Sequence, residues 1–181
     1  MSAKLVTPSE EYKDSFIEAL REGFKRGVET EKTEEEIAEI ENDFTGYLEK
    51  TRAQDQSGTI LCPDGNTYER VPSSDYWLVL DDTFIGSISL RHRLNEFLIQ
   101  FGGHIGYGVR PGFRQQGYGT LMLRLCLDEA RKIVKDTRAL LTCAEDNTGS
   151  RKIIEANGGI LEDKLDFDWH EGTVLRYWIE L

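Results

Sequence analysis

Residues 103–131, GHIGYGVRPGFRQQGYGTLMLRLCLDEAR, read as a strand, a turn rich in Gly, Arg and Gln, and a long helix. Before the turn, apolar residues alternate with small ones as far as Pro111, which would interrupt a β-ladder because proline has no backbone N–H. From Leu121 onward, apolar residues recur at spacings of three and four, as the buried face of a helix requires. The sequence therefore predicts a strand over residues 105–109 and a helix that begins near Gly117.

The start of this predicted helix is suited to bind an anion. Gly117 and Gly119 would let a ligand approach the backbone, and Arg114 adds a forked cationic donor just before them. The N–H groups of a helix start, with a dipole worth roughly half a charge behind them, fit a pyrophosphate. The residues expected to hold such a ligand are Arg114, Gln115, Gln116, Gly117, Tyr118, Gly119 and Thr120.

Three phosphate-binding signatures can be compared with this turn. A dinucleotide-binding fingerprint needs a third glycine where Met122 stands, and a P-loop needs a lysine where Tyr118 stands. The remaining pattern, R-Q-Q-G-Y-G after a strand, resembles the [QR]-x-x-G-x-[GA] acyl-CoA signature of the GNAT superfamily of N-acetyltransferases. The resemblance extends from about Trp77 to Gly159. The alternative is a glycine-rich turn that only caps a helix in another α/β domain.

The resemblance implies a fold and a co-substrate. The fold class would be α/β, with a GNAT-like central mixed sheet that contains splayed parallel strands and is flanked by helices. The splayed pair would be residues 105–109 and 139–143, and the pantetheine arm of acetyl-CoA would lie between them. Backbone groups near Val109 would then hold the thioester carbonyl and stabilise the oxyanion. Further residues expected at the cofactor are Tyr107, Gly108, Asn147 and Ser150.

Proton transfer is where the sequence departs from the family pattern. Many members carry a tyrosine that serves as general acid, and Ile154 stands at that position. The thiolate could leave unassisted, because a thiol with a pKa near 8.5 is a fair leaving group. The candidate general bases are His104, Glu145 and Asp146. The alternative for His104 is a histidine at a strand end that is bonded to a neighbouring backbone group.

Two arginines lie just before the central strand. The predicted hairpin of residues 76–90 delivers Arg91 and Arg93, which could recognise an acceptor carboxylate or the CoA phosphates. Surface arginines paired to glutamates explain them equally well. Glutamates on the predicted helix that starts at Thr33 could attract an amine or could be a solvated face.

The chain is long enough for one domain with its own core. The first helix is expected to start at the Thr7-Pro8-Ser9-Glu10 capping signal and to stop at Gly27, and the second to run from Thr33 to about Arg52. Residues 54–74 would be an active-site flap or a connector. The expected layout of the single domain 1–181 is N-terminal helices over 1–53, a loop over 54–74, a cofactor-binding core over 75–159 and a C-terminal hairpin over 160–181.

Composition excludes several classes of function. Lys and Arg total 22 against 33 Asp and Glu, so the net charge of −11 argues against nucleic acid as a partner. The three cysteines are scattered and no metal-ligand spacing occurs, which favours a reducing cytoplasm and no metal. No signal peptide and no apolar run of roughly 18 residues is present, so we expect a cytoplasmic protein without a membrane partner.

The sequence thus predicts an N-acetyltransferase that transfers an acetyl group from acetyl-CoA to a primary amine of a small molecule or an amino-acid-like acceptor by direct attack. One alternative is a degenerate GNAT domain that binds acyl-CoA without catalysis. Another is an interaction domain whose turn binds no nucleotide. Whether two copies form a homodimer is left open.

Overall fold

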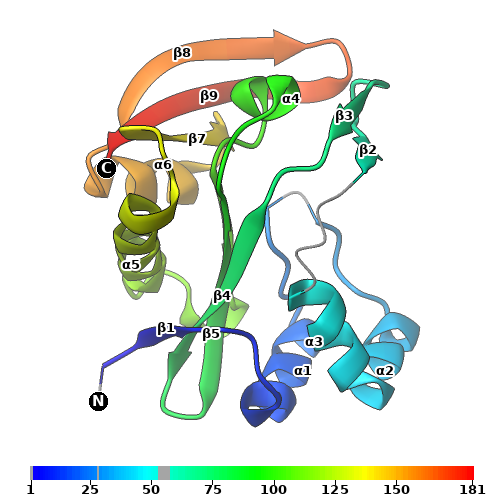
Figure 1. Ribbon diagram of the computed structural model, residues 1–181. Helices are drawn as coiled ribbons and strands as arrows, with labels where there is room; N and C mark the ends of the chain where they lie inside the picture. The colour runs from blue at the N-terminus through cyan, green and yellow to red at the C-terminus, as the bar shows by residue number, and fades with distance from the viewer. Residues whose placement is uncertain (1, 28, 53–57) are drawn as a thin grey trace. The chain divides into compact units, whose positions relative to one another are not determined.

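The computed structural model describes residues 2–27, 29–52 and 58–181 (Figure 1), so residues 54–57 of the predicted loop lie outside the described part. The chain contains both helices and strands along its length, and the predicted α/β class is confirmed. The chain divides into two compact units, and β4, β5, β6 and α5 contribute residues to both. The first unit comprises residues 1–54, 74–89 and 107–126, and the second comprises residues 55–73, 90–106 and 127–181. That the chain is one domain stays a prediction.

The first unit combines a sheet with the N-terminal helices. The strand order in the sheet is β1-β4-β5-β6, and β1 runs antiparallel to β4. The strands are β1 (Lys4–Val6), β4 (Ser73–Leu80), β5 (Thr83–Arg91) and β6 (Ile105–Val109). The helices are η1 (Glu10–Tyr12), α1 (Lys13–Arg21), α2 (Glu34–Asn42), α3 (Phe44–Arg52), η2 (Pro111–Phe113) and the first part of α5 (Tyr118–Ile133).

The N-terminal helices differ from the prediction in length. The capping box at Thr33 is confirmed, because its side chain accepts from Glu36 N and the Glu36 carboxylate accepts from Thr33 N. The predicted helix to Arg52 is wrong in one respect, since it breaks at Asp43, whose Oδ1 accepts from Gly46 N. Helix α1 ends at Arg21, before the predicted stop.

Aromatic rings hold these helices on the sheet within the first unit. Phe16 of α1 stacks on Trp77 of β4 with ring centroids 4.6 Å apart. Phe84 of β5 meets Phe16 edge-on at 5.1 Å and Phe24 at 5.0 Å. All four side chains are buried. Edge-to-face and offset pairs of this kind add to the burial energy of the rings. They therefore fix the position of α1 on β4 and β5.

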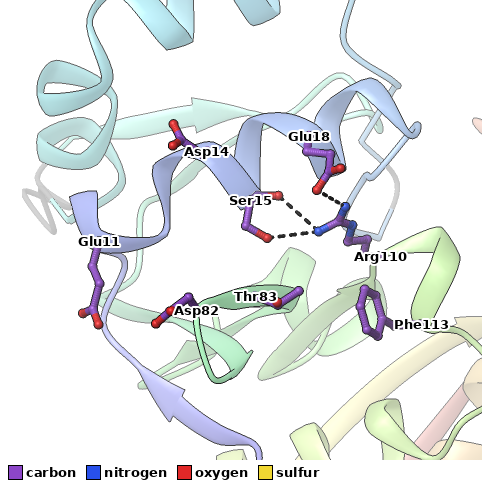
Figure 2. A pocket seen from close by; sticks show the side chains of 8 residues that line it. All are labelled: Glu11, Asp14, Ser15, Glu18, Asp82, Thr83, Arg110 and Phe113. Atoms are coloured by element: carbon purple, nitrogen blue, oxygen red, sulfur yellow. Dashed lines mark hydrogen bonds and ion pairs between the residues drawn. The ribbon is translucent and has the colours of Figure 1, made fainter.

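Arg110, directly after β6, ties the end of that strand to α1. Its side chain is 5% exposed, and its guanidinium makes a bidentate pair with Glu22, through Nε to Oε2 at 2.8 Å and Nη2 to Oε1 at 2.6 Å. Nη2 also donates to Glu18 at 2.6 Å, and Nη1 donates to Ser15 Oγ at 3.0 Å (Figure 2). The Arg110 N–H donates to Ile85 O of β5. The last residue before the glycine-rich turn is therefore fixed from three sides.

The second unit contains a sheet with strand order β7-β9-β8, and all its neighbours are antiparallel. Figure 1 shows β8 and β9 as long adjacent arrows. Register shifts interrupt the pairing of β8 at Leu161/Asp163 and at Leu165/Phe167. The elements are β2 (Thr59–Leu61), β3 (Thr67–Glu69), α4 (Glu96–Gln100), the rest of α5, β7 (Arg138–Ala144), α6 (Thr148–Ala156), β8 (Ile160–Phe167) and β9 (His170–Glu180).

Three short elements escaped the sequence prediction. The β2–β3 hairpin lies inside the stretch expected to be a loop, and helix α4 and strand β1 were not expected at all. The C-terminal hairpin was expected and is present. Its turn is at Asp168 and Trp169.

Gly102, Gly103 and His104 form a junction at the head of β6, within the second unit, and all six of their backbone polar groups are hydrogen-bonded. Arg91 Nη1 donates to the carbonyls of Gly102 (3.2 Å) and Gly103 (2.9 Å), and Arg91 N donates to His104 O (2.8 Å). The three N–H groups donate to Thr142 Oγ1 (2.9 Å), Leu98 O (2.9 Å) and Leu140 O (2.7 Å), respectively. We call this set of bonds the strand junction.

We expect Gly103→Ala to destabilise the protein. Gly103 has φ +60, and a Cβ there would lie 2.3 Å from Leu140 O, so both strain and a backbone clash oppose any side chain. Thermal unfolding should show a loss of about 2 kcal/mol or more. Gly106→Ala is the matched control, because its Cβ would meet nothing within 4 Å. Equal melting temperatures for the two variants would contradict this.

Removal of the Arg110 partners should have unequal effects. Glu22→Gln breaks the bidentate pair and leaves a buried guanidinium short of charge compensation, whereas Glu18→Gln removes one bond of a 67% exposed carboxylate. We expect a loss of about 2 kcal/mol for the first variant, reduced because Glu22 is partly exposed, and under about 1 kcal/mol for the second. Urea unfolding of both variants measures the difference.

The same pair predicts acid sensitivity. The hydrogen bond from Arg110, reinforced by its charge, holds the pKa of Glu22 below the usual glutamate value, although burial opposes it. A carboxyl whose pKa is lower in the folded state stabilises the fold above its unfolded pKa and loses this contribution as the pH falls through the folded value. Stability should therefore fall below about pH 4.5 in the wild type, and less steeply in Glu22→Gln. Parallel acid titrations of the two proteins test this.

Candidate active site

The glycine-rich turn has the backbone that an anion cradle needs. Gln115 has φ +61, an uncommon conformation for a residue with a side chain, and Gly117 has φ +83. A Cβ on Gly117 would meet nothing within 4 Å, so the space in front of it is open. Residues 114–117 are exposed, and α5 begins directly after them at Tyr118. The N–H groups of a first helical turn have no partner within the helix itself.

Two side chains of the turn donate hydrogen bonds to nearby backbone carbonyls. Arg114 Nε donates to Val109 O at 3.1 Å, and Gln116 Nε2 donates to Gly112 O at 2.9 Å. These bonds place a guanidinium at the end of β6 beside the left-handed residues. Within the predicted run, residues 114–117 are exposed, Tyr118 and Thr120 are half-buried and Gly119 is buried, and all of them belong to the first unit.

Strand β6 is crossed by the loop that follows α1. Gly27 N donates to Tyr107 O at 3.3 Å, and a Cβ on Gly108 would lie 2.4 Å from Lys25 O. On β5, a Cβ on Gly86 would lie 2.4 Å from Gly108 O. The two glycines therefore let three backbone segments approach closely at Tyr107 and Gly108. The next residue is Val109, near which the family resemblance placed the thioester carbonyl.

An ion pair beside this crossing was missed by the sequence prediction. Arg26 pairs with Asp75 of β4, with side-chain exposures of 28% and 16%, and Arg26 Nη2 also lies 3.4 Å from Glu29 Oε1. Tyr47, whose pKa is raised chiefly by burial, belongs to the same charged group. No local pattern links Arg26 to Asp75, because 49 residues separate them.

His104 is fully buried in the strand junction. Its Nδ1 accepts from Leu140 N at 2.9 Å, while its own backbone N–H donates to Leu140 O at 2.7 Å. Burial lowers the pKa of the imidazole, the Asp136 carboxylate opposes this, and Arg91 adds to the lowering. The geometry supports the structural alternative of the two roles considered for this residue.

The other predicted side chains are spread over the second unit. Arg91 binds the carbonyls of the strand junction, and Arg93 Nη2 pairs with Glu69 at 2.9 Å. Glu145 pairs with Lys164 at 2.5 Å. Asp146 is exposed, and its carboxylate has no hydrogen bond or ion pair among the described residues. Of these four, only Asp146 keeps its charged group unpaired.

The start of α6 is capped as the sequence predicts. Asn147 Oδ1 accepts from Ser150 N at 2.9 Å. Ile154, at the position of the missing tyrosine, is fully buried. Tyr177 of β9 is also buried, and its hydroxyl donates to Glu155 at 3.1 Å, so this phenol does not substitute for the missing one.

A hollow of about 630 Å³ opens elsewhere on the first unit, beside Arg110 and Phe113 (Figure 2). Its other lining residues are Glu11, Asp14, Ser15, Glu18, Asp82 and Thr83. None of residues 114–120 lines it, and the guanidinium in its wall is occupied by Glu18, Glu22 and Ser15. The hollow is therefore not lined by the glycine-rich turn, residues 114–120, at which the sequence predicts cofactor binding.

The described residues contain neither a metal-binding cluster nor a membrane-spanning helix. No group of three or more His, Cys, Asp or Glu side chains within residues 2–27, 29–52 and 58–181 is arranged to hold a metal ion. No helix in that part of the chain has the length and apolarity to cross a membrane.

Solved structures of several acetyltransferases have a fold similar to that of this chain. RimJ of Mycobacterium smegmatis, in complex with a CoA disulfide, superimposes with a TM-score of 0.67 at 17% identity, over 98% of this chain and 81% of that one. A Salmonella typhimurium acetyltransferase that modifies the N-terminal serine of ribosomal protein L7/L12 gives 0.65 at 14% identity, over 100% and 96%. The aminoglycoside acetyltransferase AAC(6')-Ib with coenzyme A gives 0.64 at 14% identity, over 99% and 95%.

A comparison with curated proteins returned no match. The family model described as "Acetyltransferase (GNAT) domain" matches residues 20–160. This range includes β6, the glycine-rich turn and the helices η2 and α5 on either side of the turn. This confirms the resemblance inferred from R-Q-Q-G-Y-G. The protein therefore belongs to the GNAT acetyltransferase family, whose members are acyltransferases with acetyl-CoA as co-substrate.

Proposed function

We propose that this enzyme transfers the acetyl group of acetyl-CoA to a primary amine of a small-molecule or amino-acid-like acceptor by direct attack. The observation that carries the proposal is the left-handed turn at Gln115 and Gly117, which opens onto the start of α5. Family membership supplies the co-substrate, and the residues present fit it: a helix start for the pyrophosphate, open space at Gly117 and a guanidinium from Arg114.

The cofactor turn would hold the phosphates through backbone N–H groups of residues 115–120, with Arg114 as the cationic partner. The β6 backbone at Tyr107, Gly108 and Val109 would face the thioester. Donors aimed at the developing oxyanion contribute roughly 3 to 4 kcal/mol in other acyl-transfer enzymes, so their placement matters as much as any side chain.

We assign the acceptor amine to the side of β6 where the loop after α1 crosses the strand. Support comes from the Arg26–Asp75 pair, which lies beside this crossing and keeps part of its surface exposed. Asp75 would accept hydrogen bonds from the acceptor ammonium, and Arg26 would meet an acceptor carboxylate. This part of the proposal replaces Arg91 and Arg93, whose guanidinium groups already serve the strand junction and Glu69.

Proton handling would need no side-chain acid. With Ile154 buried at the tyrosine position, CoA would leave as a thiolate and take its proton from water, as a thiol pKa near 8.5 permits. For the base, Asp146 is the predicted candidate whose carboxylate stays unpaired, acting through water, while Glu145 would first have to release Lys164.

A second candidate function is acyl-CoA binding without catalysis. It is favoured by the same buried Ile154 and by the engagement of His104 in backbone bonds. Thiol release from acetyl-CoA, measured against a panel of amino acids, polyamines, aminoglycosides and short peptides, separates the two. Turnover with any amine supports the acetyltransferase; CoA binding with no turnover supports the binding module.

Replacement of Gly117 tests the cofactor turn. Gly117→Glu and Gly117→Gln share the strain of a side chain at φ +83 and differ only in charge. Because a carboxylate a few ångströms from a pyrophosphate costs several kcal/mol at the surface, the Glu variant should lose roughly 100-fold more affinity for CoA than the Gln variant. Calorimetric titration measures this. Equal affinities would remove the pyrophosphate from this turn.

Asp75→Asn tests the acceptor site. We expect KM for the best amine to rise about tenfold or more while the affinity for CoA is unchanged, because the acceptor ammonium loses its counter-charge. Arg26 loses the same partner but keeps Glu29. Glu69→Gln, which breaks the exposed pair with Arg93, is the control and should leave both constants unchanged. If KM for every amine stays at its wild-type value in Asp75→Asn, the pair with Arg26 is structural.

A further inference from the structure

The side chain of His104 takes the place of a backbone carbonyl as hydrogen-bond acceptor between two strands. In ordinary strand pairing, both backbone groups of Leu140 would bond to backbone groups of a neighbouring strand. Here Leu140 O accepts from His104 N (2.7 Å) and Leu140 N donates to His104 Nδ1 (2.9 Å). One residue at the head of β6 therefore satisfies both polar groups of one residue on β7.

Every backbone carbonyl of the strand junction already accepts a hydrogen bond from Arg91, so none stands free to replace the imidazole. The carbonyls of Gly102 and Gly103 both accept from Arg91 Nη1, and His104 O accepts from Arg91 N. If the imidazole ceased to accept, Leu140 N–H would be left as a buried donor without a partner. Such a group costs about the desolvation energy of an amide, so the bond to Nδ1 is needed for the strands to meet as they do.

The bond also fixes the state of the ring. An imidazole that accepts at Nδ1 is neutral and carries its proton at Nε2. His104 Nε2 is buried and faces Asp136 Oδ2 at 3.5 Å, beyond a good hydrogen bond. The charged groups around the ring are thus Asp136, on the segment before β7, and Arg91, on β5. A second proton, at Nδ1, would point at the N–H of Leu140 and break the bond.

We propose that His104 is a positioning residue for acyl transfer: its neutral imidazole holds the head of β6 on Leu140 and so sets where the backbone donors further along β6 lie. The inference rests on the proposed function for its effect on rate, but the bond itself is a property of the apoprotein. His104 would transfer no proton. Its protonation would instead release Leu140 and disturb the start of β6.

The sign of the pH dependence follows from the bond. Burial, the largest influence, lowers the pKa of His104, so the unfolded chain binds a proton more readily than the folded one. The stabilisation is therefore fully present above the unfolded value of about 6.5 and is lost as the pH falls through the folded value. The acetylation rate should fall over the same range, and so should the protection of the Leu140 amide against hydrogen exchange.

Two variants separate positioning from catalysis. An Asn Oδ1 lies close to the place of a histidine Nδ1, so His104→Asn can still accept from Leu140 N but cannot titrate, whereas His104→Leu can do neither. Positioning predicts that His104→Asn keeps kcat/KM within about threefold of the wild type at pH 8 and loses the acid limb attributable to His104. His104→Leu should lose at least about tenfold in kcat/KM and melt at a lower temperature. A catalytic base would cost both variants at least about 100-fold in kcat with no change in melting temperature, and that result would overturn the proposal.

A measurement without acetyl-CoA covers the case in which His104→Leu does not fold or the enzyme reaction is not found. Nitrogen NMR of the wild-type apoprotein should show His104 protonated at Nε2 alone at pH 8. Leu140 should lose protection on acidification in the wild type and retain it in His104→Asn. A ring protonated at Nδ1, or equal acid sensitivity of Leu140 in both proteins, would refute the positioning role whatever the enzyme acetylates.

Discussion

The complete pairing of the backbone at Gly102, Gly103 and His104 is the constraint on which the second unit depends. Each N–H and each carbonyl of these residues has one partner, and the partners come from α4, β5 and β7. Since an unpaired buried backbone group costs a substantial part of the stability of a domain, the partners cannot shift independently. The head of β6 is therefore placed by α4, which comes just before it in the chain, by β5 and by the more distant β7.

The first unit depends on a different constraint, which is the close approach of backbone segments at two glycines. Gly86 lets β6 lie close against β5, and Gly108 lets the loop after α1 lie close against β6. Arg110 then fastens α1 to the end of the same strand. The turn that follows has only local bonds, from Arg114 to Val109 and from Gln116 to Gly112. The exposed turn with its left-handed residues thus follows directly on a strand that is packed and hydrogen-bonded to its neighbours. Ligand-binding loops are commonly positioned by regular elements in this way.

Local signals in the sequence predicted a large part of this fold. The capping box at Thr33, the cap at Asn147 and the spacing of apolar residues in α5 involve neighbours within a few positions, and each is present in the structure. The role of His104 could not be read in this way, because its partner Leu140 is 36 residues away. The Arg26–Asp75 pair is non-local in the same sense, and α4 is too short for its periodicity to be visible.

The irregular pairing of β8 bears on how copies of this protein could associate. As the outer strand of the sheet β7-β9-β8, it presents an edge to which another strand could add. The two register shifts along β8 break the regular row of donors and acceptors and increase the local twist. Such an edge is a poor template for continuing the sheet, so two chains that met along β8 would be held together by side chains and not by a shared β-ladder.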